Sequence, residues 1–290
     1  MTGYEDRFWS SRDGLKLHFR DYPAQESSGG DARPPIVCLH GLTRNARDFA
    51  DLAASLSPRW RVLCPEMRGR GDSEYAREGA SYNPLQYVDD VLALLDELEI
   101  ARFVAVGTSL GGLMTMLLAA QQPERIAGAV LNDIGPYLEP EGLERIKGYV
   151  GQGRNFPTWT HAARALEETQ AVAHPGFDLT DWIAMAKRIM TLTSTGRITF
   201  DYDMKIAEPF ATLDPHRQPD LWPAFEALSG RPVLVVRGEL SDLLSEATLS
   251  KMLARVPGTE AVLVPGVGHA PTLSEPEVQA AIERLLGGIG

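Results

Sequence analysis

The sequence has little cysteine and no long hydrophobic run. Cys38 and Cys64 are its only 2 cysteines, too few for a framework of several disulfides or a zinc site with four cysteine ligands. No apolar run approaches the ~20 residues that a helix needs to cross a bilayer. Residues 1–7 lack the basic patch and apolar core of a secretory signal. We therefore expect a cytoplasmic protein whose two cysteines are reduced and buried.

Positive charge is also scarce. The formal net charge of the 290 residues is -11 at pH 7. An acidic chain is repelled by nucleic acids and by anionic membranes, so we expect neither as a partner. We expect the substrate to be a small molecule. The sequence contains neither a Gly-x-x-x-x-Gly-Lys nor a His-Glu-x-x-His pattern. We therefore expect no organic cofactor and no metal.

Short apolar runs alternate with longer amphipathic segments along most of the chain. Buried strands are predicted at residues 36–39, 61–64, 103–106, 129–131, 233–236 and 262–264. Helices are predicted at residues 46–56, 84–98, 110–121, 245–256 and 276–286. This alternation indicates parallel strands joined by helical crossovers. A hairpin of residues 7–10 and 15–20 adds antiparallel strands at one edge, and residues 27–35 form a polar loop.

The alternation stops in a stretch that is too long for a loop inside a compact domain. We predict an α/β fold, with a mostly parallel central sheet and helices on both faces. The core comprises residues 1–136 and 216–290, and a helical cap is inserted at residues 137–215. The many aromatic residues of the cap either line a substrate pocket or form the cap's own core, and the sequence leaves both possibilities open.

The central motif is Gly-Thr-Ser-Leu-Gly-Gly at residues 107–112. In a Gly-x-Ser-x-Gly pattern the serine occupies a sharp turn from strand to helix, and the glycines let strand and helix approach closely. A predicted strand precedes this motif and a predicted helix follows it. We therefore expect Ser109 to be a nucleophile and not part of an ordinary glycine-rich turn.

A serine nucleophile needs a base, and the chain has 6 histidines. His269 follows the last predicted strand in a glycine-rich loop, which places it at the edge of the sheet where Ser109 is expected. His40 is expected to be a structural hydrogen-bonding group, and His18 to lie on the surface of the hairpin. The histidines without any motif, expected to be solvated or locally bonded, are His161, His174 and His216.

The base in turn needs a carboxylate that orients it. Asp242, in the loop after the strand at 233–236, is the first choice, with Glu239 nearby but closer to the strand end. Asp133 follows the strand at 129–131 and is a rival, because a carboxylate at either strand end can reach the same histidine. The chain order serine, Asp242, histidine is the order expected with a nucleophile in such a turn.

Two backbone N–H groups are expected to bind the oxyanion that forms on the substrate. The strand at 36–39 runs into His40-Gly41-Leu42, where the glycine lets the chain turn an amide towards the substrate. The donors would be the N–H groups of Leu42 and of Leu110, which follows the nucleophile.

Together these motifs resemble the α/β-hydrolase fold family. They are, in the family's order and rough spacing, His40-Gly41, Arg-Gly-Arg-Gly-Asp-Ser at residues 68–73, the serine motif, Asp242 and Gly268-His269. The likeness covers nearly the whole chain. Ser109 argues against haloalkane dehalogenases and epoxide hydrolases, whose nucleophile is aspartate. Thr108 and Ala270 argue against C–C bond hydrolases, which typically have Asn and Trp at these positions.

The resemblance implies a serine hydrolase that cleaves a carboxylic ester through an acyl-enzyme. The residues to which it assigns roles are Ser109, Asp242 (or Asp133), His269, Leu42 and Leu110. From the cap aromatics we expect a small apolar or aromatic substrate. A lactonase is the main alternative, and a thioesterase, a C–C bond hydrolase or a non-catalytic small-molecule binder is less favoured.

Overall fold

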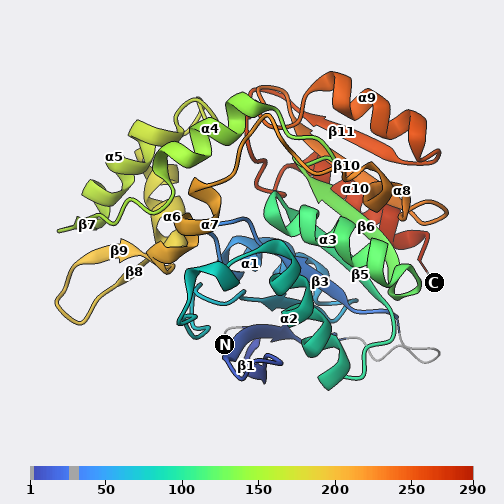
Figure 1. Ribbon diagram of the computed structural model, residues 1–290, viewed down its shortest axis with the longest axis horizontal. Helices are drawn as coiled ribbons and strands as arrows, with labels where there is room; N and C mark the ends of the chain where they lie inside the picture. The colour runs from blue at the N-terminus through green and yellow to red at the C-terminus, as the bar shows by residue number, and fades with distance from the viewer. Residues whose placement is uncertain (1–2, 26–32, 290) are drawn as a thin grey trace.

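The computed structural model describes residues 3–25 and 33–289 (Figure 1). Its main sheet has 8 strands in the order β1-β2-β4-β3-β5-β6-β10-β11. β1 (Glu5–Ser10) and β2 (Lys16–Tyr22) form the predicted antiparallel hairpin at one edge. Residues 27–32 of the predicted polar loop lie outside the described residues, as do the first two residues of the amino-terminal segment.

All the predicted apolar runs are strands of this sheet. They are β3 (Ile36–Leu39), β4 (Val62–Pro65), β5 (Phe103–Thr108), β6 (Ile126–Asn132), β10 (Val233–Gly238) and β11 (Glu260–Val264). These strands run parallel to their neighbours, and only the hairpin strand β2 meets β4 antiparallel. The predicted α/β fold is therefore confirmed.

Helices cover both faces of the sheet, so each strand has two apolar sides. In β3, Ile36 and Cys38 face one apolar cluster and Val37 and Leu39 face the other, because successive side chains point to opposite faces. The 3₁₀ turn η1 (Ala46–Phe49), α1 (Ala50–Leu56) and α10 (Pro276–Gly287) pack on the first cluster. The second cluster is covered by α2 (Pro84–Glu97), α3 (Leu110–Gln121), α8 (Trp222–Glu226) and α9 (Glu246–Arg255).

Cys38 and Cys64 are free and buried, as expected. Three further 3₁₀ turns are η2 (Gly79–Ser81), η3 (Pro123–Arg125) and η4 (Met204–Ile206). None of the helices in the described ranges is both long and apolar enough to span a bilayer.

The insertion forms a group of elements at one end of the molecule, coloured from green to amber in Figure 1. Its helices are α4 (Pro140–Tyr149), α5 (Trp159–Gln170), α6 (Leu179–Ile189) and α7 (Ala207–Ala211). It also contains an antiparallel sheet of β7 (Asn155–Phe156), β9 (Ile198–Phe200) and β8 (Met190–Leu192), in that order. The sequence indicated the helices of the cap but not this small sheet. Strands of two or three residues are too short to show a periodic pattern in sequence.

The cap has an apolar core of its own. Phe156 and Trp182 are buried there among α5, α6 and the small sheet, and Trp159, Phe177 and Phe200 pack against them. Most aromatic residues of this cluster therefore hold the cap together, which was one of the two possibilities left open by the sequence.

Candidate active site

Ser109 is the single residue between β5 and α3. Its backbone has φ 53° and ψ -115°, a strained conformation for a residue with a side chain. A Cβ at Gly111 would lie 1.9 Å from the Leu39 carbonyl oxygen, and one at Gly107 would lie 2.4 Å from the Gly111 backbone. Only glycine at these positions lets the strand and helix meet closely enough to form this turn.

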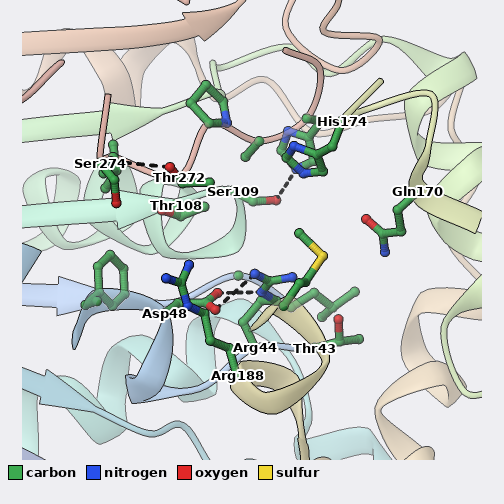
Figure 2. Close-up of a pocket in the computed structure, with 18 of the residues that line it drawn as sticks. Thr43, Arg44, Asp48, Thr108, Ser109, Gln170, His174, Arg188, Thr272 and Ser274 are labelled. Carbon is green, nitrogen blue, oxygen red and sulfur yellow. Dashed lines mark hydrogen bonds and ion pairs between the residues drawn. The ribbon is translucent and has the colours of Figure 1, made fainter. Parts of the chain in front are cut away.

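Three side chains form a hydrogen-bonded chain at the carboxyl edge of the sheet. Ser109 Oγ lies 2.9 Å from His269 Nε2, the bond drawn at Ser109 in Figure 2. His269 Nδ1 lies 2.7 Å from Asp133 Oδ2. The buried Asp133 carboxylate also accepts hydrogen bonds from the Gly238 N–H, at 2.9 Å, and from Ser241 Oγ, at 2.6 Å. These donors hold the carboxylate in one orientation towards the ring.

Asp242, the first-choice acid, does not contact His269, and that expectation is corrected. Its carboxylate is bound by both Nε and Nη2 of Arg145 from α4, with Nη2 2.8 Å from Oδ1. Burial tends to raise the pKa of Asp242, but the Arg145 guanidinium outweighs burial and lowers it. Glu239 accepts a hydrogen bond from the Gly266 N–H at 2.7 Å. The rival Asp133 therefore occupies the orienting position.

His40 is buried and bonds to backbone groups on both sides, which confirms its structural role. Its Nε2 accepts a hydrogen bond from the Met67 N–H at 3.0 Å, so Nδ1 carries the proton and donates to the Gly41 carbonyl at 2.8 Å. Burial lowers the pKa of His40 to about 4, which keeps the ring neutral at pH 7. Because the Gly41 carbonyl points at His40, the N–H of Leu42 in the same planar peptide points the opposite way.

Arg70 holds the next peptide of this loop, a contact that the sequence patterns did not indicate. Its Nε and Nη2 donate to the Leu42 carbonyl oxygen at 3.0 and 2.8 Å. The guanidinium is completely buried, lies 4.7 Å from the centre of the Tyr87 ring, and forms no ion pair within the described part of the chain. The N–H of Leu110, the first residue of α3, lies in the first helical turn, where N–H groups have no acceptor within the helix.

A cavity of about 350 Å³ lies beside Ser109, between core and cap. Figure 2 shows Ser109 and His174 at one end of it, and the guanidinium groups of Arg44 and Arg188 at the other. Its polar and charged lining residues include Thr43, Arg44, Asp48, Thr108, Gln170, Arg188, Thr272 and Ser274. The aromatic side chains in the lining are Phe49, Tyr149 and Phe177. The lining of the cavity is therefore mixed, with polar and charged groups beside apolar ones.

Two histidines differ from their predicted surroundings. His18, expected on the surface, is only 1% exposed, and its ring nitrogens lie 2.9 Å from carboxylate oxygens of Glu66 and Asp6. The Phe8 ring, with its centre 5.2 Å from that of His18, and these two carboxylates cover the side chain. His174, expected to be solvated, is only 4% exposed and lines the cavity. Sequence patterns did not indicate either environment, because Glu66 lies 48 residues from His18 and the cavity beside His174 is completed by distant residues such as Ser109.

Comparison with known proteins supports this reading of the fold. The model of the alpha/beta hydrolase family matches residues 36–282. A 3-hydroxybutyrate-oligomer hydrolase of Cupriavidus necator is 38% identical over 267 residues, which cover 90% of this chain and 91% of the relative. A 2-(acetamidomethylene)succinate hydrolase of Mesorhizobium japonicum is 30% identical, with 84% of each chain covered. The crystal structure of an alpha/beta hydrolase from Novosphingobium aromaticivorans is 61% identical, with a TM-score of 0.93 and 99% of each chain covered.

Proposed function

The chain belongs to the α/β-hydrolase family, and from this premise we propose that it hydrolyses a carboxylic ester through an acyl-enzyme on Ser109. The observation that carries the proposal is the hydrogen-bonded chain Ser109–His269–Asp133, with distances of 2.9 and 2.7 Å, at the wall of the cavity between core and cap. A serine becomes a nucleophile near neutral pH when an oriented base can take its proton.

In the first step Ser109 Oγ attacks the ester carbonyl carbon while His269 Nε2 takes the hydroxyl proton. Asp133 accepts the Nδ1–H bond, which holds the productive tautomer and stabilises the imidazolium. The carbonyl oxygen becomes an oxyanion, which in this proposal accepts hydrogen bonds from the N–H groups of Leu42 and Leu110. The C–O bond then breaks as His269 gives its proton to the leaving alcohol.

In the second step a water molecule takes the place of the alcohol. His269 removes a proton from the water, whose oxygen attacks the acyl carbon and forms a second oxyanion. The bond to Ser109 Oγ breaks, the proton returns to Oγ, and the carboxylic acid leaves. His269 carries out every proton transfer in these two steps.

We propose short hydroxyacyl esters as the substrate class. The relative that is 38% identical over nine-tenths of the chain is named for 3-hydroxybutyrate oligomers, in which such acids are joined by ester bonds. The hydroxyl, amide and charged groups in the mixed lining of the cavity support this class over the aromatic esters expected from the cap sequence.

Reaction with a fluorophosphonate tests the proposed nucleophile directly. We expect the intact protein to gain one phosphonyl group, located on Ser109 by peptide mass spectrometry, because only an activated serine attacks this reagent quickly. Heat-denatured protein is the control and should stay unmodified. A native protein that does not react would contradict the proposed mechanism.

Arg70→Met is expected to lower kcat for p-nitrophenyl butyrate by about tenfold to a hundredfold, with a smaller change in KM. The variant removes both donors to the Leu42 carbonyl, so the peptide that presents the Leu42 N–H loses its support. The matched control is Arg125→Met, which removes a bond to the Ile100 carbonyl far from the cavity. Equal kcat values for the two variants, both folded by circular dichroism, would show that Arg70 does not position this loop.

A further inference from the structure

The segment between α5 and α6 rests directly on the loop that carries His269. The Gly268 N–H donates to the Ala173 carbonyl at 2.6 Å. A Cβ at Gly268 would lie 2.8 Å from Ala173 Cα, so glycine is required for this contact. The next residue, His174, donates its N–H to the Gln170 carbonyl at 3.2 Å, which extends the end of α5. The backbone of His174 is therefore held in place relative to His269.

The His174 ring is firmly packed but lacks a hydrogen bond. It stacks on Phe177 with ring centroids 4.5 Å apart and meets the edge of Trp182 at 6.2 Å. Its Nδ1 is buried and has no hydrogen-bond partner among the described residues. The ring lines the same cavity as Ser109, at the same end of it in Figure 2. Nε2 also has no hydrogen-bond partner among the described residues and, unlike Nδ1, is not fully enclosed, so it is the nitrogen through which the ring can bind a ligand in the cavity.

The protonation state of His174 limits which ligand groups its ring can bind. Burial lowers the pKa of His174 to about 4, and the positive charge of Arg44 acts in the same direction. At pH 7 the ring is therefore neutral, with one N–H donor and one lone pair. A neutral ring offers no charge to attract a carboxylate. A hydroxyl group matches it, because a hydroxyl can both donate and accept.

We propose that His174 is a specificity-determining residue that hydrogen-bonds the hydroxyl group on the acyl chain of a hydroxyacyl ester. The inference rests on the proposed hydrolysis at Ser109 and adds the group that selects the acyl chain. A site built to bond a hydroxyl discriminates against the analogue that lacks it, since Nε2 then stays unpaired in the cavity. His174 acts on the choice of substrate and takes no proton in the reaction.

The test compares binding of methyl 3-hydroxybutyrate with that of methyl butyrate, two esters that differ by this hydroxyl. Binding is measured by ligand-observed NMR in a Ser109→Ala background, where turnover cannot interfere. We expect the hydroxy ester to bind about tenfold more tightly. His174→Phe, which keeps a ring on Phe177 but has no nitrogen, should abolish that preference. His174→Leu is the second variant, used if the larger ring unfolds the cap in thermal melts.

His161→Phe is the matched control. His161 lies in the same cap, is exposed, and bonds only locally to Thr158, so this variant should keep the preference. A preference that survives in folded His174→Phe or His174→Leu overturns the proposal. So does equal binding of the two esters to Ser109→Ala alone, or loss of the preference in His161→Phe as well.

The experiment distinguishes failure of the proposed hydrolysis from failure of the His174 proposal. If the protein with Ser109 intact hydrolyses neither ester, yet the Ser109→Ala protein prefers the hydroxy ester through His174, the proposed hydrolysis is wrong and the His174 contact stands.

Discussion

Ser109→Ala is expected to lower kcat/KM for p-nitrophenyl butyrate by at least about a thousandfold. The variant removes the attacking oxygen, so no acyl-enzyme can form, and only binding and oxyanion stabilisation remain to help water attack. Alanine adds no atom to the tight turn between β5 and α3, so we expect the fold to be kept. Release of p-nitrophenolate by purified protein, followed by absorbance, measures the effect.

Ser274→Ala is the control for this variant. Ser274 lines the same cavity with a hydroxyl, but it takes no part in the hydrogen-bonded chain to Asp133. We expect its kcat/KM to stay within about threefold of the unmodified protein, a typical range for a residue that does not bind the transition state. Substantial turnover by Ser109→Ala would mean that another group attacks the ester.

Asp133→Asn is expected to lower kcat by about ten-thousandfold, the second large effect. An asparagine amide can donate to His269 Nδ1 and would then favour the tautomer with its proton on Nε2. That tautomer cannot accept the proton of Ser109. The substitution keeps the size of the side chain, so kcat measured on the folded variant reports the loss of the charge and of the tautomer.

Asp242→Asn is the matched comparison, since it makes the same change at the other candidate acid. It weakens the ion pair with Arg145 between core and cap and leaves the contacts of His269 unchanged. We expect kcat to fall by less than about tenfold and the melting temperature to drop slightly. If activity were lost only in Asp242→Asn, Asp242 and not Asp133 would be the residue that orients His269.

The order of strands and helices was readable from the sequence because its signals are local. Strands such as β3 are buried on both faces and therefore appear as uninterrupted apolar runs. The helix at 110–121 was predicted to the residue, since a glycine-rich turn marks its start. Ser109 and His269 were found for the same reason, because each lies in a short glycine-rich segment next to a strand.

The orienting acid could not be chosen this way. β6 and β10 are neighbours in the sheet, so Asp133 and Asp242 both follow strands that end at the same edge. Asp133 is held towards the ring by Gly238 and Ser241, more than 100 residues away, and Asp242 is bound by Arg145 of the cap, 97 residues before it. A contact over such a distance leaves no pattern in either segment.

The sequence by itself determined the α/β fold and indicated the serine and histidine that the structure brings together, since backbone geometry and burial leave local patterns in residue type. Only the tertiary structure decided which carboxylate orients His269, that Arg70 supports the Leu42 peptide, and that His174 lines the cavity beside Ser109. The physical reason is that hydrogen bonds and ion pairs of side chains join segments far apart in the chain, and their partners are chosen by packing.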